Sequence, residues 1–306
     1  MEHAAYPARI RRCVEGGGAV NFLMKQNLIS LCLVPILAFG NWAMDFDEDW
    51  AAASAGPVTL TFEYDSTYPA TITIGGTGYG QPADPSKALV DAGDGVFVPW
   101  TTNTITLKGK QIRFRGDWRN SGGNFRDLFR STFAGGHYVT MSGGFDFEGA
   151  PAYAMFNATF RDCSNLTGPI PSGLFGNISG APAAQMFNST FYNCSNLTGS
   201  IPVGLFGNIS GAPTATIFYA TFYNCSNLTG SIPVGLFGNI SGTPAIYMLN
   251  ATFQSCSKLT GESALMPDGT THLYEQFPTA SGTDCDNCYY GATGLNDYAT
   301  MPAAWK

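Results

Sequence analysis

The chain has 306 residues, of which 44% are hydrophobic and only 12% are charged. This length suits about two domains, and the apolar share is large enough for a real core. A formal net charge of −7 disfavours electrostatic attraction to nucleic acid or to an anionic membrane surface, so we expect neither as a partner.

The first 43 residues are typical of an export segment. A short basic start at residues 24–27 precedes an apolar run at 28–39, and Gly40 and Ala43 offer cleavage points. The run is too short for a membrane span, which needs about 20 residues. We therefore predict a signal peptide at about 24–43 that starts at Met24, with residues 1–23 as an extension in front of it. The mature chain is expected to be secreted or displayed at the cell surface, without a membrane span.

Residues 44–118 are predicted to form a β-rich domain that caps the rest of the chain. Apolar and polar residues alternate over 58–64 and over 70–74, as they do in half-buried strands. Residues 104–107 and 111–115 have the same character and flank a Lys-Gly-Lys turn, which predicts a hairpin.

The next part of the chain is repetitive. From residue 155 to residue 247 one 31-residue sequence occurs three times, and atypical copies extend this to about five units within residues 119–280. A fixed period of this length predicts stacked units, each of which buries its apolar face against its neighbours. From Cys163 to Ser257 there is no Asp, Glu, Lys, Arg or His, the residues on which acid–base and metal chemistry depend. We therefore expect a binding protein and not an enzyme, with no cofactor and no metal site.

Within a unit, the spacing of apolar residues predicts two short helices and one strand. Residues 183–193 have near-helical spacing, and 203–209 fit a single helical turn. Between them, apolar and hydroxyl residues alternate over 197–201, which predicts a parallel strand with Leu197 and Ile201 facing inward. The predicted fold class is an α/β solenoid with one short parallel strand and short helices in each unit, preceded by the small β-rich domain.

Six of the eight cysteines lie beyond the predicted signal peptide. Four recur at the repeat period, and we predict that they are buried free thiols: Cys163, Cys194, Cys225 and Cys256. The other two, Cys285 and Cys288, form a CxxC in the predicted C-terminal cap at 281–306. In an exported protein this pair favours a local disulfide, with a redox or metal role as the alternative.

The repeated string TFYNCSNLTGSIPVGLFGNI resembles a leucine-rich repeat. It is most similar to the BspA-like repeats of bacterial surface proteins, through Phe191, Cys194, Leu197, Ile201 and Pro202 and their equivalents in the other units. The resemblance covers about residues 120–306. It implies a leucine-rich-repeat-type solenoid that is secreted or displayed on the cell surface and adheres to host cells, matrix or other microbes. It brings no catalytic residues.

The outward positions of the predicted strands form the expected binding surface. They are Thr167, Thr198, Ser200, Thr229, Ser231 and Thr260. A neutral face lined with hydroxyls suits sugars or polypeptide backbone, because both accept short hydrogen bonds. The alternative is that Thr and Ser stand there only because they favour strands and solubility. On the first interpretation the protein is a monomeric adhesin whose partner is an extracellular protein or glycan.

A carbohydrate-binding accessory module is an alternative function. In that case Trp100 and Trp118 of the β-rich domain would stack on sugars. The competing interpretation is that both tryptophans seal this domain against the repeats.

A hydrolase is a third function, and the sequence supports it least. Its acids would come from Asp117, Asp127, Asp146 and Glu148, but no motif links these four residues. The histidines do not help, because His137 and His272 are isolated in the sequence and give no indication of a metal site.

Overall fold

The computed structural model describes residues 11–15, 18–22, 60–75, 79–145, 148–280 and 282–306. The chain divides into two compact units, Met1–Trp50 and Ala51–Lys306. The described part of the first unit is an antiparallel hairpin of β1 (Arg11–Glu15) and β2 (Gly18–Phe22). The signal peptide predicted at about 24–43 lies outside the described residues. Among the described residues, no helix is long and apolar enough to cross a membrane.

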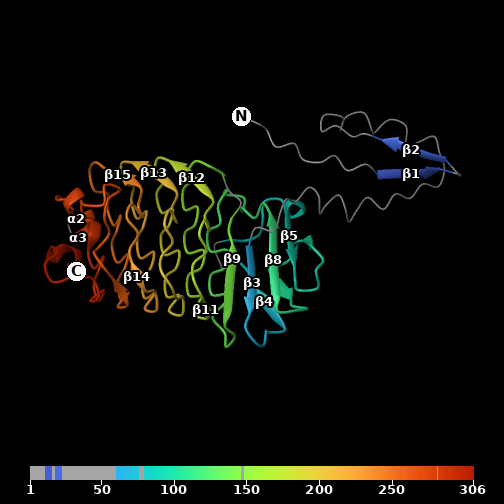
Figure 1. Cartoon of the computed structure of the whole chain (residues 1–306), viewed down its shortest axis with the longest axis horizontal. Coiled ribbons are helices and arrows are strands. Elements are labelled where there is room, and N and C mark those ends of the chain that lie inside the picture. The colour runs from blue at the N-terminus through green and yellow to red at the C-terminus, as the bar shows by residue number, and fades with distance from the viewer. Residues whose placement is uncertain (1–10, 16–17, 23–59, 76–78, 146–147, 281) are drawn as a thin grey trace. The chain divides into compact units, whose positions relative to one another are not determined.

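A six-stranded sheet begins the second unit (Figure 1). Its strands, in spatial order, are β11 (Leu166–Thr167), β9 (Val139–Gly143), β3 (Leu60–Tyr64), β8 (Gln111–Gly116), β5 (Ala88–Asp91) and β6 (Val98–Pro99). The 3-10 helix η2 (Pro85–Lys87) leads into β5. In β3, Leu60, Phe62 and Tyr64 are buried and the residues between them are not, so the alternation predicted for this strand is confirmed. Because β9 pairs in parallel with β11, the sheet continues from the β-rich region into the repeats.

A second sheet contains only β4 (Thr71–Thr73) and β7 (Thr104–Thr106). The strand predicted over 70–74 is therefore confirmed. The hairpin predicted between 104–107 and 111–115 is wrong, because β8 pairs with β3 and β5 and not with β7.

Close packing of the Lys-Gly-Lys segment explains this difference. The backbone N–H of Lys108 donates to the Ala92 carbonyl at 2.8 Å, so it cannot close a turn. Gly109 approaches Gly93 so closely that a Cβ there would overlap the Gly93 carbonyl oxygen. The segment therefore carries the chain from one sheet to the other.

Each repeat contains a run of turns where residues 183–193 predict a helix. Every fourth residue in the run has a left-handed backbone. In this repeat these residues are Gln185, Ser189 and Asn193. The N–H of Phe187 donates to Ile217 O of the next repeat at 2.9 Å, and the following N–H, of Asn188, closes a local turn on Gln185 O at 3.2 Å. An α-helix would use these groups within itself. The turn run uses alternate N–H groups to tie each repeat to the next.

The repeats also form two ladders of short parallel strands on opposite edges of the stack (Figure 1). The first contains β11, the Gly168–Leu197 bridge, β14 (Gly230–Ser231) and β16 (Leu259–Thr260). The second contains β10 (Glu148–Gly149), β12 (Asn177–Gly180), β13 (Asn208–Gly211) and β15 (Asn239–Ile240). The first ladder includes the position of the predicted strand. The helical turn predicted over 203–209 is a pair of tight turns instead, closed by Leu205 N–H on Pro202 O at 3.3 Å and by Gly207 N–H on Gly204 O at 2.9 Å. The chain then enters β13 of the second ladder, where Ile209 is buried between exposed Asn208 and Ser210.

The core of the stack consists of columns of rings and small polar groups. In one column Phe160, Phe191 and Phe222 stack with ring centroids 5.4 and 5.6 Å apart. Beside it, Thr190 Oγ1 donates to Phe156 O at 2.9 Å, and Cys194 Sγ donates to Phe160 O at 3.0 Å. The four cysteines of the repeats are buried free thiols, as predicted: Cys163, Cys194, Cys225 and Cys256.

The C-terminal segment closes the stack. It contains α2 (Leu273–Gln276), α3 (Gly282–Cys285) and η3 (Ala303–Trp305). The turn pattern recurs here, because Phe253 N–H donates to Cys288 O at 2.7 Å. Tyr289 stacks on Phe253 at 5.5 Å, and Trp305 stacks on Tyr289 at 6.3 Å. The described chain is thus mostly β-structure and turns, with short parallel strands in small sheets and few helices, which corrects the expected α/β class.

Candidate functional site

The residues predicted to bind a ligand form a continuous surface along the first ladder. Thr198, Ser200, Thr229, Ser231 and Thr260 are exposed, and Thr167 is half-buried. We call these six residues the strand face. Backbone hydrogen bonds hold it in register: Thr198 N–H donates to Gly168 O at 3.0 Å, and Thr229 N–H donates to Gly199 O at 2.9 Å. The structure therefore brings together all six predicted residues.

Glycines keep the strand face flat. Gly199 and Gly230 have φ of 75° and 76°, a left-handed conformation that favours glycine. A Cβ at Gly230 would lie 3.3 Å from Ser200 Cβ in the preceding repeat. Because no side chain intervenes, short hydroxyls and backbone make up most of this surface.

The C-terminal end of the strand face changes character. Glu262 follows Gly261 as Ser231 follows Gly230, so a carboxylate stands where the two preceding repeats carry a serine hydroxyl. Asn296 N–H donates to Gly261 O at 2.7 Å, which extends the ladder into the cap, and its Nδ2 donates to Glu262 Oε1 at 3.1 Å. The face is neutral along its length and acidic only at this end.

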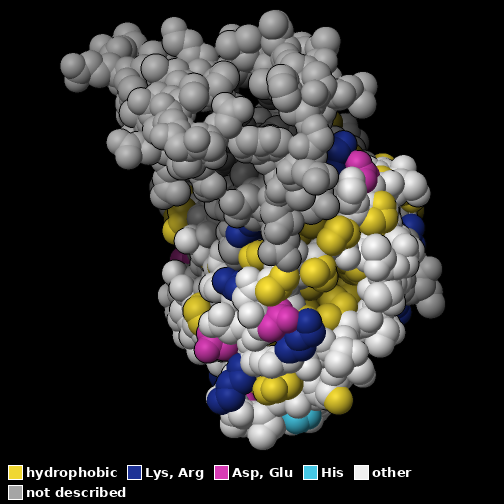
Figure 2. Space-filling model, turned by 90° about the vertical axis from the view of Figure 1, so that its right-hand side faces the viewer, with side chains coloured by type: hydrophobic (Ala, Val, Ile, Leu, Met, Phe, Trp, Pro, Cys, Tyr) yellow, Lys and Arg dark blue, Asp and Glu magenta, His cyan; other side chains and the backbone are white. Residues whose placement is uncertain are grey.

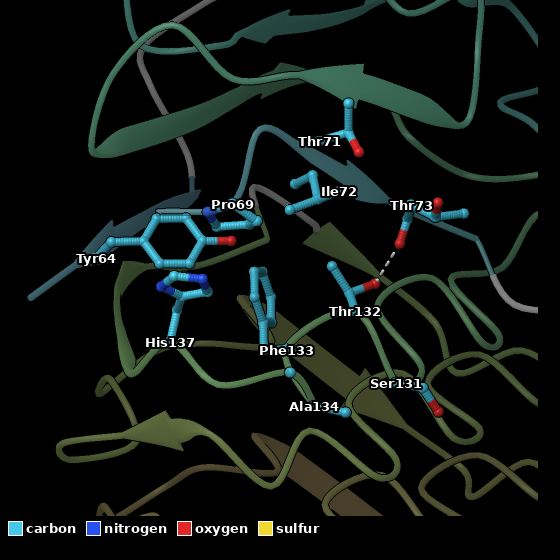
Figure 3. A pocket seen from close by; sticks show the side chains of 11 residues that line it. Tyr64, Pro69, Thr71, Ile72, Thr73, Ser131, Thr132, Phe133, Ala134 and His137 are labelled. Carbon is cyan, nitrogen blue, oxygen red and sulfur yellow. Dashed lines mark hydrogen bonds between the residues drawn. The ribbon is translucent and has the colours of Figure 1, made fainter. Parts of the chain in front are cut away.

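A second surface feature lies between the β-rich region and the first repeat. It is an open groove of about 410 Å³ lined by the end of β3, by β4 and by residues 131–137. Figure 3 shows Tyr64 and His137 side by side at one end of the groove, and the hydrogen bond from Thr132 Oγ1 to Thr73 O at 2.9 Å at the other. The rings of Tyr64 and His137 meet edge to face, with centroids 6.3 Å apart.

The titration of Tyr64 reflects its position in this groove. Burial, followed by the nearby Cys163, raises the pKa of Tyr64 to about 12. A tyrosine is neutral at physiological pH with or without this shift, and only 3% of Tyr64 is exposed, so the residue contributes mainly the inner wall of the groove. Hydroxyls of Thr71, Thr73 and Ser131 also line the groove. Hydroxyls beside aromatic rings suit a small polar ligand such as a sugar. Nothing in the sequence indicated this site, because its walls come from segments about 60 residues apart.

The two tryptophans expected to stack on sugars do not reach the surface. Trp100 and Trp118 are each 1% exposed. Trp100 stacks on Tyr79 with centroids 5.8 Å apart, and Trp118 Nε1 donates to Arg115 O at 3.0 Å. A stacking platform needs an exposed ring face, so this version of the carbohydrate-module hypothesis is wrong. The alternative, that both tryptophans seal this domain against the repeats, stays a prediction with which their burial agrees.

The candidate hydrolytic acids do not form a site among the described residues. Asp117 is exposed and pairs with Arg119 at 2.7 Å, which holds the pKa of Asp117 below its usual value. Asp127 is buried and lies 3.4 Å from both Arg126 Nε and Arg130 Nη1. Such pairs are typical of structural carboxylates. Asp146 and the side chain of Glu148 lie outside the described residues.

The disulfide predicted between Cys285 and Cys288 is not formed in the structure, which has two buried thiols there. Cys288 occupies the position in the turn run that Thr252 has in the preceding repeat, because Phe222 N–H donates to Thr252 O as Phe253 N–H does to Cys288 O. Cys285 Sγ donates to Ala304 O at 3.4 Å. Each thiol thus has a place in the packing of the cap. Burial raises the pKa of Cys285 to about 12, so it is a weak nucleophile and metal ligand.

One group of residues was missed in the sequence. Glu262, His272 and Asp297 each offer a metal-ligating atom, and these atoms lie within 4.8 Å of one another. They are separated by 10 and 25 residues in a part of the chain that does not repeat, so no spacing pattern indicates them.

Comparison of the chain with models of known protein families, with curated proteins and with solved structures finds no match. The resemblance of the repeats to a family therefore rests on the residues quoted above.

Proposed function

We propose that this protein is a secreted or cell-surface adhesin, built on a BspA-like leucine-rich-repeat solenoid, that binds an extracellular protein or glycan through the strand face. The observation that carries the proposal is the exposed, in-register row of hydroxyls on the first ladder. The rows of the fold that face inward are filled by Leu, Ile and Phe, so the hydroxyls are the side chains that this edge offers to a partner.

The chemistry of the row favours binding without catalysis. From Cys163 to Ser257 the chain has no acidic, basic or histidine side chain. Neutral hydroxyls spaced one repeat apart donate and accept hydrogen bonds, which matches the polar groups of a glycan or an extended polypeptide. A long, flat surface of this kind suits an extended ligand better than a small molecule.

The test is a binding screen of the purified chain against glycans and extracellular matrix proteins. We expect saturable binding that Thr198→Arg with Thr229→Arg abolishes, because bulky charges would separate the ligand from the face. The matched control is Asn208→Arg with Asn239→Arg, which places the same charges at the same spacing on the opposite ladder, at two exposed positions. Equal losses of binding in the two double variants, or unchanged binding in Thr198→Arg/Thr229→Arg, would contradict the proposal.

The groove of Figure 3 favours a second candidate function, the binding of a sugar at the junction of the β-rich region and the first repeat. His137 Nδ1 lies 3.0 Å from Thr67 Oγ1, at the rim of this groove. A sugar that still binds the Thr198→Arg/Thr229→Arg variant but not Tyr64→Phe or His137→Ala would place the site here.

A further inference from the structure

Glu262, His272 and Asp297 reach one point from three segments of the C-terminal region. Glu262 follows β16, His272 is the N-cap of α2, and Asp297 precedes η3. Their ligating atoms lie within 4.8 Å of one another. We infer that these three side chains form a binding site for one divalent transition-metal ion of the zinc type. This inference is independent of the proposed function.

The separation of the two inner ligands fits a single ion. His272 Nδ1 lies 3.5 Å from Asp297 Oδ2. With metal–ligand bonds of about 2.0–2.1 Å, two ligands of a tetrahedral Zn²⁺ are about 3.4 Å apart. The ion therefore needs little movement of either side chain. Glu262 is exposed, and its side chain can turn towards the pair as the third ligand.

A second set of contacts orients the ligands. Asp297 accepts hydrogen bonds from Ser263 N–H at 2.9 Å and from Ser263 Oγ at 2.6 Å. The imidazole of His272 stacks on Tyr274 with centroids 4.8 Å apart and planes 8° apart. His272 N–H donates to Glu275 Oε2 at 2.8 Å, which anchors the residue at the start of α2. Hydrogen-bonded carboxylates and a fixed imidazole are the usual surroundings of metal ligands in proteins.

The carboxylates of the site have no lysine or arginine partner in the part of the chain that the structure describes. The side chain of Asp297 is only 9% exposed, and Glu262 and Glu275 lie nearby. Among the described residues, no Lys or Arg forms an ion pair with any of the three. Lys306 Nζ is engaged by the carbonyls of Tyr298 and Ala299, at 2.9 Å each. Asp297 accepts hydrogen bonds from Ser263 and, at 3.4 Å, from the Tyr274 hydroxyl, and a divalent ion would in addition neutralise its charge.

The ligand set favours a transition metal over calcium or magnesium. Imidazole nitrogen suits zinc and its neighbours, whereas Ca²⁺ and Mg²⁺ prefer six or more oxygen ligands. Three protein ligands also leave one coordination position for water or for a group of a bound ligand. Because Glu262 lies two residues after Thr260, the last residue of the strand face, the site borders the C-terminal end of that surface.

The same region contains a serine, a histidine and an aspartate, but not in the arrangement of a hydrolytic triad. Ser263 is 1% exposed, and its hydroxyl already donates to Asp297. In a triad the two imidazole nitrogens face serine and aspartate separately. Here Nδ1 of His272 faces both, at 3.0 Å from Ser263 Oγ and 3.5 Å from Asp297 Oδ2. Ser263 therefore positions Asp297 and is not a nucleophile.

The test uses the full chain, stripped with a chelator under reducing conditions and dialysed against Zn²⁺, with Ca²⁺ and Mg²⁺ in parallel. We expect one Zn²⁺ per chain and at least a tenfold weaker affinity in His272→Ala, Asp297→Asn and Glu262→Gln, each measured by competition with a chromophoric chelator. His137→Ala, at the other described histidine, is the matched control and should bind Zn²⁺ as tightly as the wild type does.

One of these variants and one further measurement keep the outcome unambiguous. Glu262 is exposed, so Glu262→Gln should fold normally even if the other variants do not. Co²⁺ in place of Zn²⁺ should give d–d bands without the intense sulfur-to-metal band of a thiolate site. Absence of Zn²⁺ binding, an affinity unchanged in Glu262→Gln, a thiolate band, or tighter binding of Ca²⁺ or Mg²⁺ would each overturn the inference.

Discussion

The β-rich region and the repeats satisfy their buried polar groups in different ways. In the β-rich region Asp91 is fully buried, and it accepts from Gly93 N–H at 2.8 Å, from Gly95 N–H at 3.0 Å and from Arg113 Nε at 2.6 Å. Charged side chains of both signs are interspersed on this end of the molecule (Figure 2). In the repeats from Cys163 to Ser257 there is no charge, and buried Thr and Cys donate to carbonyls of the preceding unit.

Periodicity explains this difference. A residue that recurs in every repeat lies close to its own copies, and like charges at such a distance repel. An amide does not have this problem, because it donates to one neighbour and accepts from the other. Asn224 Nδ2 donates to Asn193 Oδ1 at 2.7 Å, and Asn193 Nδ2 donates to Asp162 Oδ1 at 3.4 Å. The one carboxylate in this row of side chains, Asp162, stands at its first position, where it only accepts a hydrogen bond.

The largest effect is expected where the repeats depend on stacked rings. Phe191→Ala would remove a fully buried ring that stacks on both Phe160 and Phe222. We expect a loss of about 4 kcal/mol in the free energy of unfolding, measured by urea denaturation. Phe191→Leu keeps most of the apolar volume and should lose about 1–2 kcal/mol. Equal stabilities of the two variants would contradict the role assigned to the columns.

The distance between repeats can be tested with a pair of glycines. Gly204 and Gly207 both have φ of 70°, so alanine costs about 1 kcal/mol at either position through the backbone alone. A Cβ at Gly207 would also overlap Ile178 O of the preceding repeat, whereas nothing lies within 4 Å of one at Gly204. In thermal or urea unfolding, Gly207→Ala should therefore cost about 3 kcal/mol in total. Similar losses of stability in Gly204→Ala and Gly207→Ala would show that neighbouring repeats can move apart at little cost.

The β-rich region should respond most to loss of its buried carboxylate. Asp91→Ala leaves two backbone N–H groups and the half-buried Arg113 without their acceptor. We expect a loss of about 2–3 kcal/mol, reduced because Arg113 retains some contact with water. Asp91→Asn keeps one acceptor oxygen and should lose less. A neutral result for Asp91→Ala would mean that this region, like the repeats, does not depend on charge.

The comparison also shows what could be predicted from the sequence. The repeat period, the inward Leu197 and Ile201 and the outward Thr198 and Ser200 all follow from a pattern copied in every unit. The helix at 183–193 was a wrong prediction for a physical reason. Buried residues of the turn run recur every four positions, which is close to the 3.6-residue period of an α-helix. The left-handed residues that distinguish the two, such as Gln185 and Ser189, have no special composition.

Sites outside the repeats could not be predicted in this way. The groove beside Tyr64 and His137 and the cluster at His272 depend on segments that meet only in the folded chain. The Lys-Gly-Lys segment has the composition of a hairpin turn, and its contacts with Ala92 and Gly93, far away in sequence, decide otherwise. Each of these features is a single occurrence, so no internal copy supports its interpretation.

Alkaline pH should destabilise the repeats gradually, through their buried thiols. Burial raises the pKa of Cys163 and of Cys256 to about 12 and that of Cys225 well above its usual value. Below about pH 8 these thiols are protonated in both the folded and the unfolded chain, so they do not affect the pH dependence of stability. Above about pH 9 the unfolded chain loses these protons and the folded chain keeps them, so the free energy of unfolding should fall as pH rises.

A single substitution can isolate this contribution. Cys225→Ser keeps a group that can donate to Phe191 O, as the thiol does at 3.1 Å, but removes the titration. Between about pH 9 and 11, its free energy of unfolding should fall less steeply than that of the wild type, by about 1.4 kcal/mol per pH unit. Between pH 5 and 8 the free energies of unfolding of the two proteins should change with pH in the same way. Identical slopes above pH 9 would show that Cys225 ionises equally in the folded and unfolded chains, and the repeats would then be more open to water than their packing indicates.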